Sequence, residues 1–428
     1  MPTADERRGW SRLTAAVLAE GVGTVHDLHR AATNLAFRFV GPLGRPVQRV
    51  HDRVVDGVYR GLQRGCVGAG EVGVHFAEGV GTAAAVSHHA VAEVLGEDPA
   101  ETYDLSTIWT APWSVRARSI AHGVLDERFL AVAPELDLEV TLRHRGEVVA
   151  TAPDRLRHTY PQAGSRLAVF VHGLIHSEGV WFDRPGPGPS LPEVAASNGV
   201  TPLLVRYGTG RAIGRNGADL AALLEAIVAG WPVPVDELTI VGHSMGGLVA
   251  RSAAVTASRE QHRWVEPLAR VVYLGTPHLG SWLEKFANVT SWTLRRASPG
   301  SAPLGRLLDG RSRGIKDLRF GTLLEEQWGG ADVDALLSGL AQDEPWLAGV
   351  DHHLIAGRVR PSEQHLLNLV FGDSLVRAAS AAGAGRIRRI AGDTQVSLVP
   401  LDGGHVSLVR HPAVVELLRT TLATPASA

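Results

Sequence analysis

The sequence predicts an α/β protein in which a mostly parallel sheet is covered by helices on both faces. The short run at 167–171 is wholly apolar and contains β-branched residues, and this run and further predicted strands such as 238–241 alternate with amphipathic stretches such as 216–229. A strand that is apolar at every position is expected to be buried on both faces, as in a parallel sheet. Because strands of this kind alternate with helices, we assign residues 135–428 to one large α/β domain.

The elements of this domain follow from the periodicity of apolar residues. Residues 136–142 alternate between apolar and polar, which predicts a half-buried strand, and a turn at Arg145-Gly146 leads to an antiparallel partner at 148–150. Further strands are predicted at 167–171, 203–207, 238–241, 271–274, 353–359 and 396–399, with helices at 216–229, 245–257 and 412–422.

A segment at about 281–350 does not fit this alternation. It contains four of the ten tryptophans: Trp282, Trp292, Trp328 and Trp346. We expect a lid-like insertion over a site, and the alternative is a cap with only a packing role.

Residues 1–98 are expected to form an N-terminal helical appendage outside the α/β domain. Apolar residues recur every three or four positions within 18–39, 47–62 and 72–94. Such helices can pack on the main domain or on another subunit, or they can lie at a membrane surface as a peripheral contact. Disorder of this region is the third alternative. Residues 99–134 form a connecting segment, with a predicted helix at about 115–130.

The composition is that of a globular protein and excludes several classes of function. The formal net charge is −2, whereas a nucleic-acid-binding protein normally has a strong basic excess. Cys66 is the only cysteine, so neither an intrachain disulfide nor a cysteine-based zinc site is expected. No His-Glu-x-x-His motif or Walker motif is present, and we expect neither a metal nor another cofactor. Without a secretory pattern or a stretch of roughly 18 apolar residues, a cytoplasmic location is expected, with membrane contact through the N-terminal helices as the alternative.

The motif with the clearest chemistry is Gly242-His243-Ser244-Met245-Gly246. It fits Gly-x-Ser-x-Gly, with a predicted strand directly before it and a predicted helix directly after it, as a nucleophile elbow requires. The sharp turn presents the serine side chain at the carboxyl edge of the sheet, and small residues on either side avoid collisions. We therefore predict Ser244 as a catalytic nucleophile, and the alternative is a structural tight turn.

A second turn, at the end of an earlier buried strand, has the sequence His172-Gly173-Leu174. Such a turn can present the N–H of Leu174 to an oxyanion that also accepts from the N–H of Met245. Two donors aimed at one developing charge form an oxyanion hole. His172 is expected to orient this loop rather than to transfer protons.

The order of Val-His-Gly-Leu, Gly-His-Ser-Met-Gly-Gly and Leu274-Gly-Thr-Pro-His-Leu-Gly280 resembles the lipase and esterase branch of the α/β-hydrolase superfamily. The last segment is similar to a loop of lipases and of lipase-like proteins of the GPI-inositol-deacylase type. The resemblance covers roughly residues 135–422 and implies the α/β-hydrolase fold. It also implies a catalytic triad in the order Ser, acid, His.

Two residues complete the triad that this resemblance implies. His405 follows the last predicted strand in Asp-Gly-Gly-His and is expected to be the base, and His411 is expected to be a surface or capping residue. Asp373, in the connection after the strand at 353–359, is expected to be the acid, although Arg377 stands where many relatives have proline. Asp393 and Asp402 are the competing carboxylates.

These expectations together predict a carboxyl-ester hydrolase. Its substrate is expected to be a small-molecule or lipid ester with an apolar acyl group, cleaved through an acyl-enzyme at Ser244. An acyltransferase or thioesterase with the same triad is one alternative. A non-catalytic scaffold that binds a lipid or a protein partner is an alternative of another class.

Overall fold

The structure is a computed structural model of the 428-residue chain. It describes residues 134–182, 188–280, 312–318, 321–328, 344–359, 395–401 and 405–423, together with Ile390, Thr394 and scattered helical positions between 5 and 131. Among the helices so described, none combines the length and the apolar character that a membrane span requires.

The chain divides into two compact units. The first comprises residues 1–104, 125–137 and 286–311, and the second comprises residues 105–124, 138–285 and 312–428. In the first unit, Gln63 Nε2 donates to Ala19 O at 3.3 Å, and His26 Nε2 lies 2.8 Å from Asp56 Oδ1. All four residues are helical. Ala19 pairs with Gln63 and His26 pairs with Asp56, so the partners follow one another in opposite order along the chain. The two helical segments are therefore antiparallel at these positions. The domain boundaries after residues 98 and 134 remain predictions, and so does the role of the insertion at about 281–350 as a lid.

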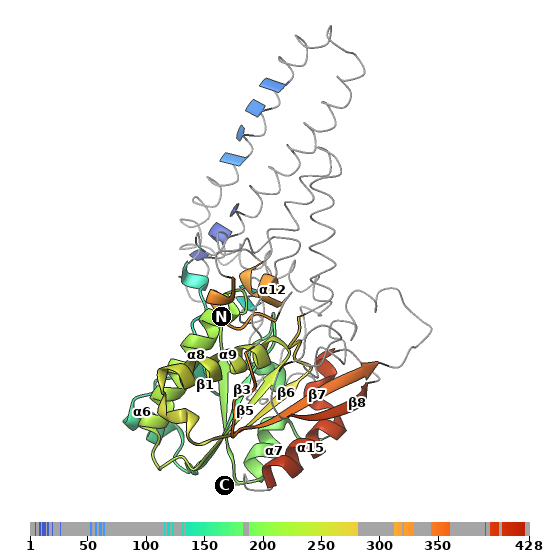
Figure 1. The fold of residues 1–428 in the computed structure, drawn as a ribbon. Helices are drawn as coiled ribbons and strands as arrows, with labels where there is room; N and C mark the ends of the chain where they lie inside the picture. The colour runs from blue at the N-terminus through green and yellow to red at the C-terminus, as the bar shows by residue number, and fades with distance from the viewer. Residues whose placement is uncertain are drawn as a thin grey trace. The chain divides into compact units, whose positions relative to one another are not determined.

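An eight-stranded sheet forms the centre of the second unit (Figure 1). Its order is β2-β1-β4-β3-β5-β6-β7-β8. The strands are β1 Thr141–His144, β2 Glu147–Val149, β3 Arg166–Val171, β4 Thr201–Arg206, β5 Glu237–His243, β6 Leu268–Leu274, β7 Asp351–Val359 and β8 Gln395–Leu401. β1 is antiparallel to both β2 and β4, and the six strands from β4 to β8 in the sheet order are parallel. The carboxyl ends of these six strands therefore lie at one edge.

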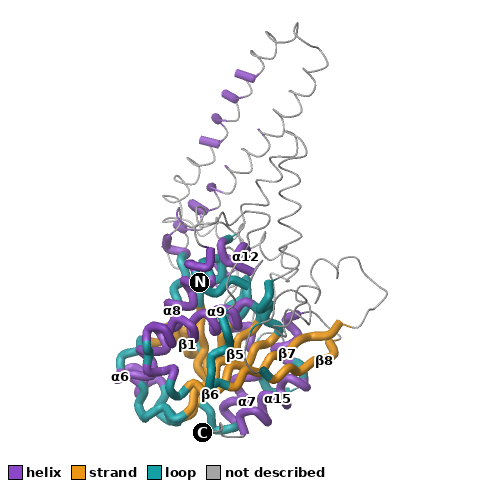
Figure 2. Tube along the Cα trace, in the orientation of Figure 1, coloured by secondary structure: helices purple, strands orange, loops and turns teal. Residues whose placement is uncertain are grey.

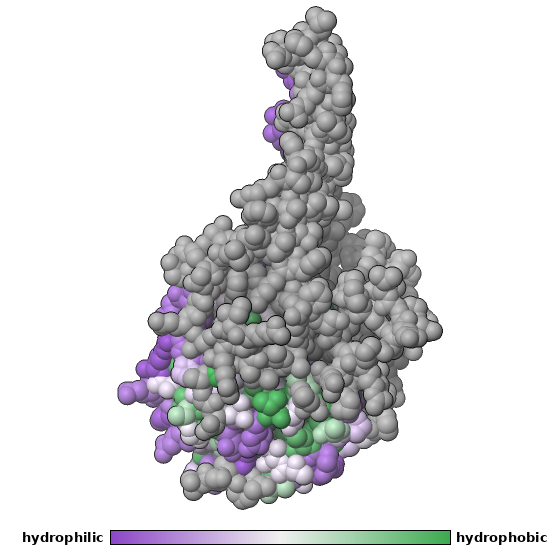
Figure 3. Space-filling model, turned by 45° about the vertical axis from the view of Figure 1, so that its right-hand side comes forward, coloured by the Kyte–Doolittle hydropathy of each residue, from purple (hydrophilic) through white to green (hydrophobic). Residues whose placement is uncertain are grey.

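Helices cover both faces of the sheet (Figures 1 and 2). α8 Ile213–Gly230, α9 Met245–Glu260 and α6 Pro153–Thr159 pack on one face, and α7 Leu191–Ser197 and α15 Pro412–Ala423 pack on the other. β3 contributes Leu167, Val169 and Val171 to the first core and Ala168 and Phe170 to the second. Because both of its faces are buried, every position from Leu167 to Val171 is apolar. The predicted α/β architecture is confirmed. On the face shown in Figure 3, hydrophilic and hydrophobic residues are mixed over the described surface.

The shorter elements lie mainly in the connections. They are η2 Pro134–Leu136, η3 Glu178–Trp181, η4 Arg263–Val265, α12 Arg313–Leu318, η5 Glu325–Trp328 and η7 His405–Arg410. Asp317 of α12 accepts a hydrogen bond from Ile213 N at 2.9 Å, at the start of α8. Ser252 of α9 donates to Leu323 O at 2.6 Å. The described parts of the predicted insertion therefore pack on α8 and α9, and Trp346 is buried in the core.

The structure corrects the start of the first predicted strand. Residues 134–136 form a 3-10 helix, and the ladder begins only at Thr141, not at Leu136. Thr141 pairs with Arg206, the last residue of β4, so the ladder has no further partner residue in that strand. A hydrogen bond from Gly208 N to Leu138 O at 3.1 Å connects the chain before β1 to the chain after β4.

Candidate active site

Ser244 is the only residue between β5 and α9. Its backbone has φ 53° and ψ −121°, a region that residues with side chains rarely adopt. Ser244 N donates to Leu274 O at 2.8 Å, and Gly247 N donates to Ser244 O at 3.1 Å. The half-buried serine is thus held in a strained turn at the carboxyl edge of the sheet, between a strand and the first turn of a helix.

The glycines of this turn are required by close backbone contacts. A Cβ on Gly242 would lie 2.6 Å from Gly247 Cα, and a Cβ on Gly246 would lie 2.2 Å from Val171 O. Both distances are shorter than any ordinary contact, so the first turn of α9 lies as close to the end of β5 and to the end of β3 as the backbones allow. His243, between them, is buried.

The loop after β3 lies directly against the serine. A Cβ on Gly173 would be 3.1 Å from Ser244 Cβ and 3.0 Å from His243 Nδ1. Leu174 follows, half-buried, and Met245 is the first residue of α9. The first N–H groups of a helix have no partner within the helix, so the amide of Met245 is in a position to donate to a ligand. The two predicted oxyanion donors therefore belong to segments that meet at Ser244.

His172 orients this loop, as its sequence context predicts. Its ring stacks on Tyr207 with centroids 4.5 Å apart, and its Nδ1 lies 3.0 Å from Gly173 O. Tyr207 N donates to Nε2 at 3.4 Å, so Nδ1 is the nitrogen that carries the proton. Burial lowers the pKa of His172 to about 4, and the ring is neutral at physiological pH.

His405 is the first residue of η7, which follows β8. Because β8 is parallel to β5, its carboxyl end lies at the same edge of the sheet as Ser244. η7 also contacts η3, the short helix that follows the Gly173–Leu174 loop. The side chain of His405 lies outside the described residues, as do Asp373, Asp393 and Asp402. The assignment of base and acid therefore stays a prediction.

The model of the family described as "Alpha/beta hydrolase family" matches residues 168–417, which is more than half of the chain. The chain belongs to the alpha/beta hydrolase family. This confirms the superfamily that the motifs at 171–174, 242–247 and 274–280 resemble.

Several solved structures align with this hydrolase. A lipase of Bacillus licheniformis in its mature form is 20% identical, with a TM-score of 0.39, over 60% of this chain and 92% of its own. An esterase of Pyrobaculum calidifontis is 13% identical, with a TM-score of 0.34, over 61% and 77%. An esterase of Pyrococcus furiosus is 13% identical, with a TM-score of 0.35, over 62% and 85%. No curated protein matches the sequence.

Three other histidines of the hydrolase have structural contacts. His411 Nδ1 accepts from Ala413 N at 3.2 Å, which confirms that His411 is a capping residue at the start of α15. His278 is buried between Tyr273 and Trp346, with ring centroids 4.6 and 4.8 Å away, and burial lowers its pKa well below the usual range. Burial likewise lowers the pKa of His352 to about 4, and its Nδ1 lies 3.1 Å from the Tyr273 hydroxyl.

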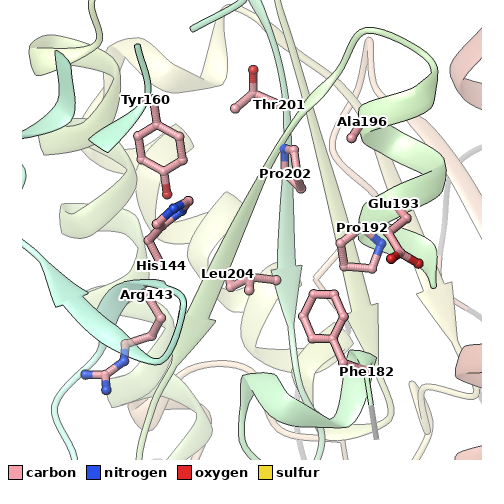
Figure 4. Close-up of a pocket in the computed structure, with 10 residues that line it drawn as sticks. All are labelled: Arg143, His144, Tyr160, Phe182, Pro192, Glu193, Ala196, Thr201, Pro202 and Leu204. Carbon is pink, nitrogen blue, oxygen red and sulfur yellow. The ribbon is translucent and has the colours of Figure 1, made fainter. Parts of the chain in front are cut away.

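A pocket of about 200 Å³ lies at the β1–β4 side of the hydrolase sheet (Figure 4). Phe182, Pro192 and Leu204 face one another across one part of it, and His144 and Tyr160 lie together in another part. No predicted catalytic residue lines this pocket.

Within the described ranges, no three His, Cys, Asp or Glu side chains come together as a metal site would require.

Two contacts of the predicted oxyanion loop involve residues that sequence reasoning did not single out. His176 Nδ1 lies 2.7 Å from Leu174 O, and Thr209 Oγ1 accepts from Ile175 N at 3.2 Å. Thr209 follows β4, so only the adjacency of β3 and β4 in the sheet could have suggested that it lies near Ile175.

Proposed function

We propose that this chain is a serine hydrolase that cleaves carboxylic esters through a Ser244–His405–Asp373 triad. The observation that carries the proposal is the strained conformation of Ser244 between β5 and α9, with Gly173 packed against its side chain. Strain of this kind is retained where the surrounding structure fixes a functional geometry.

In the proposed reaction, His405 accepts the proton of the Ser244 hydroxyl as its oxygen attacks the ester carbonyl. Asp373 holds the imidazole in the correct tautomer and stabilises its charged form. The N–H groups of Leu174 and Met245 donate to the oxyanion of the tetrahedral intermediate. His405 then protonates the departing alcohol, and a water that it activates releases the acyl group from Ser244.

We propose apolar acyl esters, including lipid esters, as the substrates. The loop beside the nucleophile supports this, because Leu174 and Ile175 are apolar and Ile175 is 38% exposed. A substrate's acyl chain can gain binding energy by covering such side chains.

Labelling with an active-site fluorophosphonate tests the nucleophile. The wild type and the control Ser197→Ala should be labelled, because Ser197 lies at the end of α7 and is exposed. Ser244→Ala should not be labelled and should lose ester hydrolysis by about 10⁴-fold or more. Equal labelling of Ser244→Ala and wild type would remove Ser244 from the mechanism.

Steady-state kinetics on p-nitrophenyl esters of graded chain length test the other two residues of the proposed triad, His405 and Asp373. His405→Ala and Asp373→Asn should each lower kcat by at least about 10³-fold, because triad residues act as a unit. Asp393→Asn and Asp402→Asn are matched controls that should retain most of the activity. A larger loss in either control than in Asp373→Asn would reassign the acid.

A further inference from the structure

The loop between β3 and η3 has two central peptide groups, Gly173–Leu174 and Leu174–Ile175, and both are held by contacts with neighbouring groups. In the first, Gly173 O accepts from His176 N at 3.3 Å and lies 3.0 Å from His172 Nδ1. The N–H and C=O of a trans peptide point in opposite directions. Because Gly173 O is held by these two groups, the N–H of Leu174 is directed to the opposite side.

The next peptide group is held by two different residues. Leu174 O lies 2.7 Å from His176 Nδ1, and Ile175 N donates to Thr209 Oγ1 at 3.2 Å. Ile175 has φ 60°, which is an outlier for a β-branched residue and persists only where neighbours enforce it. The Thr209 hydroxyl is the contact that fixes the N–H of this residue.

Thr209 is itself enclosed by segments from distant parts of the chain. It is 1% exposed. A Cβ on Gly123 would lie 2.6 Å from Ile175 Cγ2 and 3.0 Å from Thr209 Oγ1, and a Cβ on Gly314 would lie 2.1 Å from Thr209 O. Ser312 Oγ donates to Gly123 O at 2.5 Å, which joins the connecting segment to the start of α12. The hydroxyl of Thr209 therefore has little room to move away from Ile175.

We propose that Thr209 is a positioning residue for oxyanion stabilisation, and that Gly123 supports it by allowing the connecting segment to pack closely on Thr209 and Ile175. Through Ile175, the Thr209 hydroxyl fixes the two peptide groups that aim the N–H of Leu174. The proposal rests on the proposed function, since it gives that N–H a role in ester hydrolysis.

The expected kinetic effect follows from when the oxyanion forms. A carbonyl oxygen gains its negative charge in the transition state, so a misaligned donor slows the chemical step more than it weakens substrate binding. Thr209→Val keeps the shape of the side chain but removes the acceptor. It should lower kcat for a short p-nitrophenyl ester about 10- to 100-fold and leave KM within about twofold, which is less than the loss of a whole donor.

Two comparisons separate positioning from a general loss of packing. Thr209→Ser retains the hydroxyl and should keep kcat within about threefold of wild type. Thr239→Val makes the same chemical change at a fully buried threonine in β5, whose hydroxyl has no hydrogen-bond partner in the described part of the chain, and should leave kcat unchanged. Equal kcat values for Thr209→Val and Thr239→Val, or for Thr209→Val and Thr209→Ser, would overturn the proposal.

A second variant approaches the same contact from the connecting segment and covers the case in which Thr209→Val does not fold. Gly123→Ala should lower kcat without raising KM, whereas Gly61→Ala, which has open space around the added methyl group, should not. Wild-type kcat for Gly123→Ala would overturn the role of Gly123. A folded wild type that neither hydrolyses esters nor reacts with fluorophosphonate would overturn the proposed function, whereas an active wild type with an equally active Thr209→Val would overturn only the role of Thr209.

Discussion

The conformation of Ser244 depends on the residues beside it more than on its own chemistry. Gly246 lies where Val171 O and His172 O approach the first turn of α9, and a Cβ there would be 2.2 and 2.3 Å from these oxygens. Both oxygens belong to backbone at the end of β3, which is held in the middle of the sheet by β4 and β5. They cannot retreat as the end of a flexible side chain would.

Replacing this glycine should therefore damage both stability and activity. Gly246→Ala should lower the free energy of unfolding by about 2–4 kcal/mol and reduce kcat, because overpacking must displace either β3 or α9. Gly164→Ala is the matched control, since its Cβ would meet only Thr201 Oγ1 at 3.6 Å and Gly199 O at 3.7 Å. Urea unfolding and ester kinetics of both variants check the prediction. Equal stability of the two variants would contradict the packing argument.

The sequence predicts the local part of this site well and its distant part poorly. The Gly-x-Ser-x-Gly elbow is a five-residue feature, so its strand, turn and helix are all visible in consecutive residues. The contact between Thr209 and Ile175 joins residues 34 positions apart. It exists because β4 lies beside β3 in the sheet order, which no local pattern encodes.

At the level of elements, a buried ion pair connects η3 to the end of β4. Arg206, the last residue of β4, donates through Nε to Glu178 Oε2 at 2.6 Å and makes a second bond to Oε1. Arg143 of β1 adds its Nε at 3.7 Å from Oε1. Burial alone would raise the pKa of Glu178, but hydrogen bonding and charge from Arg206 outweigh it and lower that pKa. The carboxylate thus stays charged between two guanidinium groups.

Removing this carboxylate should leave the buried Arg206 without its hydrogen-bonded counter-charge. Glu178→Gln should lower the free energy of unfolding by about 3–5 kcal/mol, as expected when one partner of a buried pair is lost. Glu416→Gln breaks a pair with Arg419 at 2.6 Å in which both side chains are largely exposed, and should cost no more than about 1 kcal/mol. Denaturant unfolding at pH 7 compares the two. Similar losses would show that Glu178 is not desolvated in solution.

Some helices and strands were predicted from the sequence more accurately than others, depending on how distinctive their residue pattern is. The buried strands β3, β5 and β6 were predicted within a few residues, because short runs of mainly apolar residues have few other interpretations. The short helix α7 was missed, although Ser190 and Glu193 fit the Ser-x-x-Glu pattern of a capping box and form one in the structure. The strand predicted from Leu136 was wrong in its start, because alternation fixes which face a residue occupies but not how far the neighbouring strand extends.

At the scale of the whole molecule, several neutral histidines are buried in the hydrolase unit. Burial lowers the pKa of His172 and of His352 to about 4, and burial with charge from Arg251 lowers that of His278 well below its usual range. An unfolded chain binds a proton at each of these residues near the ordinary pKa of about 6.5. Between pH 6.5 and about 4 the unfolded state therefore holds more protons than the native state.

This difference sets the direction of the pH dependence. The contribution of these residues to stability is fully present above about pH 6.5 and is lost as the pH falls toward 4, with a slope of up to about 1.4 kcal/mol per pH unit for each histidine. Urea unfolding at intervals between pH 7.5 and 4.5 measures this slope. A free energy of unfolding that does not change over this range would contradict the burial of neutral histidines.

The variant His278→Leu tests one of these histidines separately. Neither ring nitrogen of His278 has a hydrogen-bond partner among the residues that the structure describes, so an apolar side chain of similar size should be tolerated at pH 7. The variant removes one proton-binding site from the unfolded state, and its slope below pH 6.5 should fall by about 1.4 kcal/mol per pH unit at most. Leu220→Ala, which opens a cavity in the core under α8, should lower stability at every pH without changing the slope. A slope for His278→Leu that equals the wild-type slope would mean that His278 is protonated in the native state, and the buried cluster with Tyr273 and Trp346 would then have to open to water.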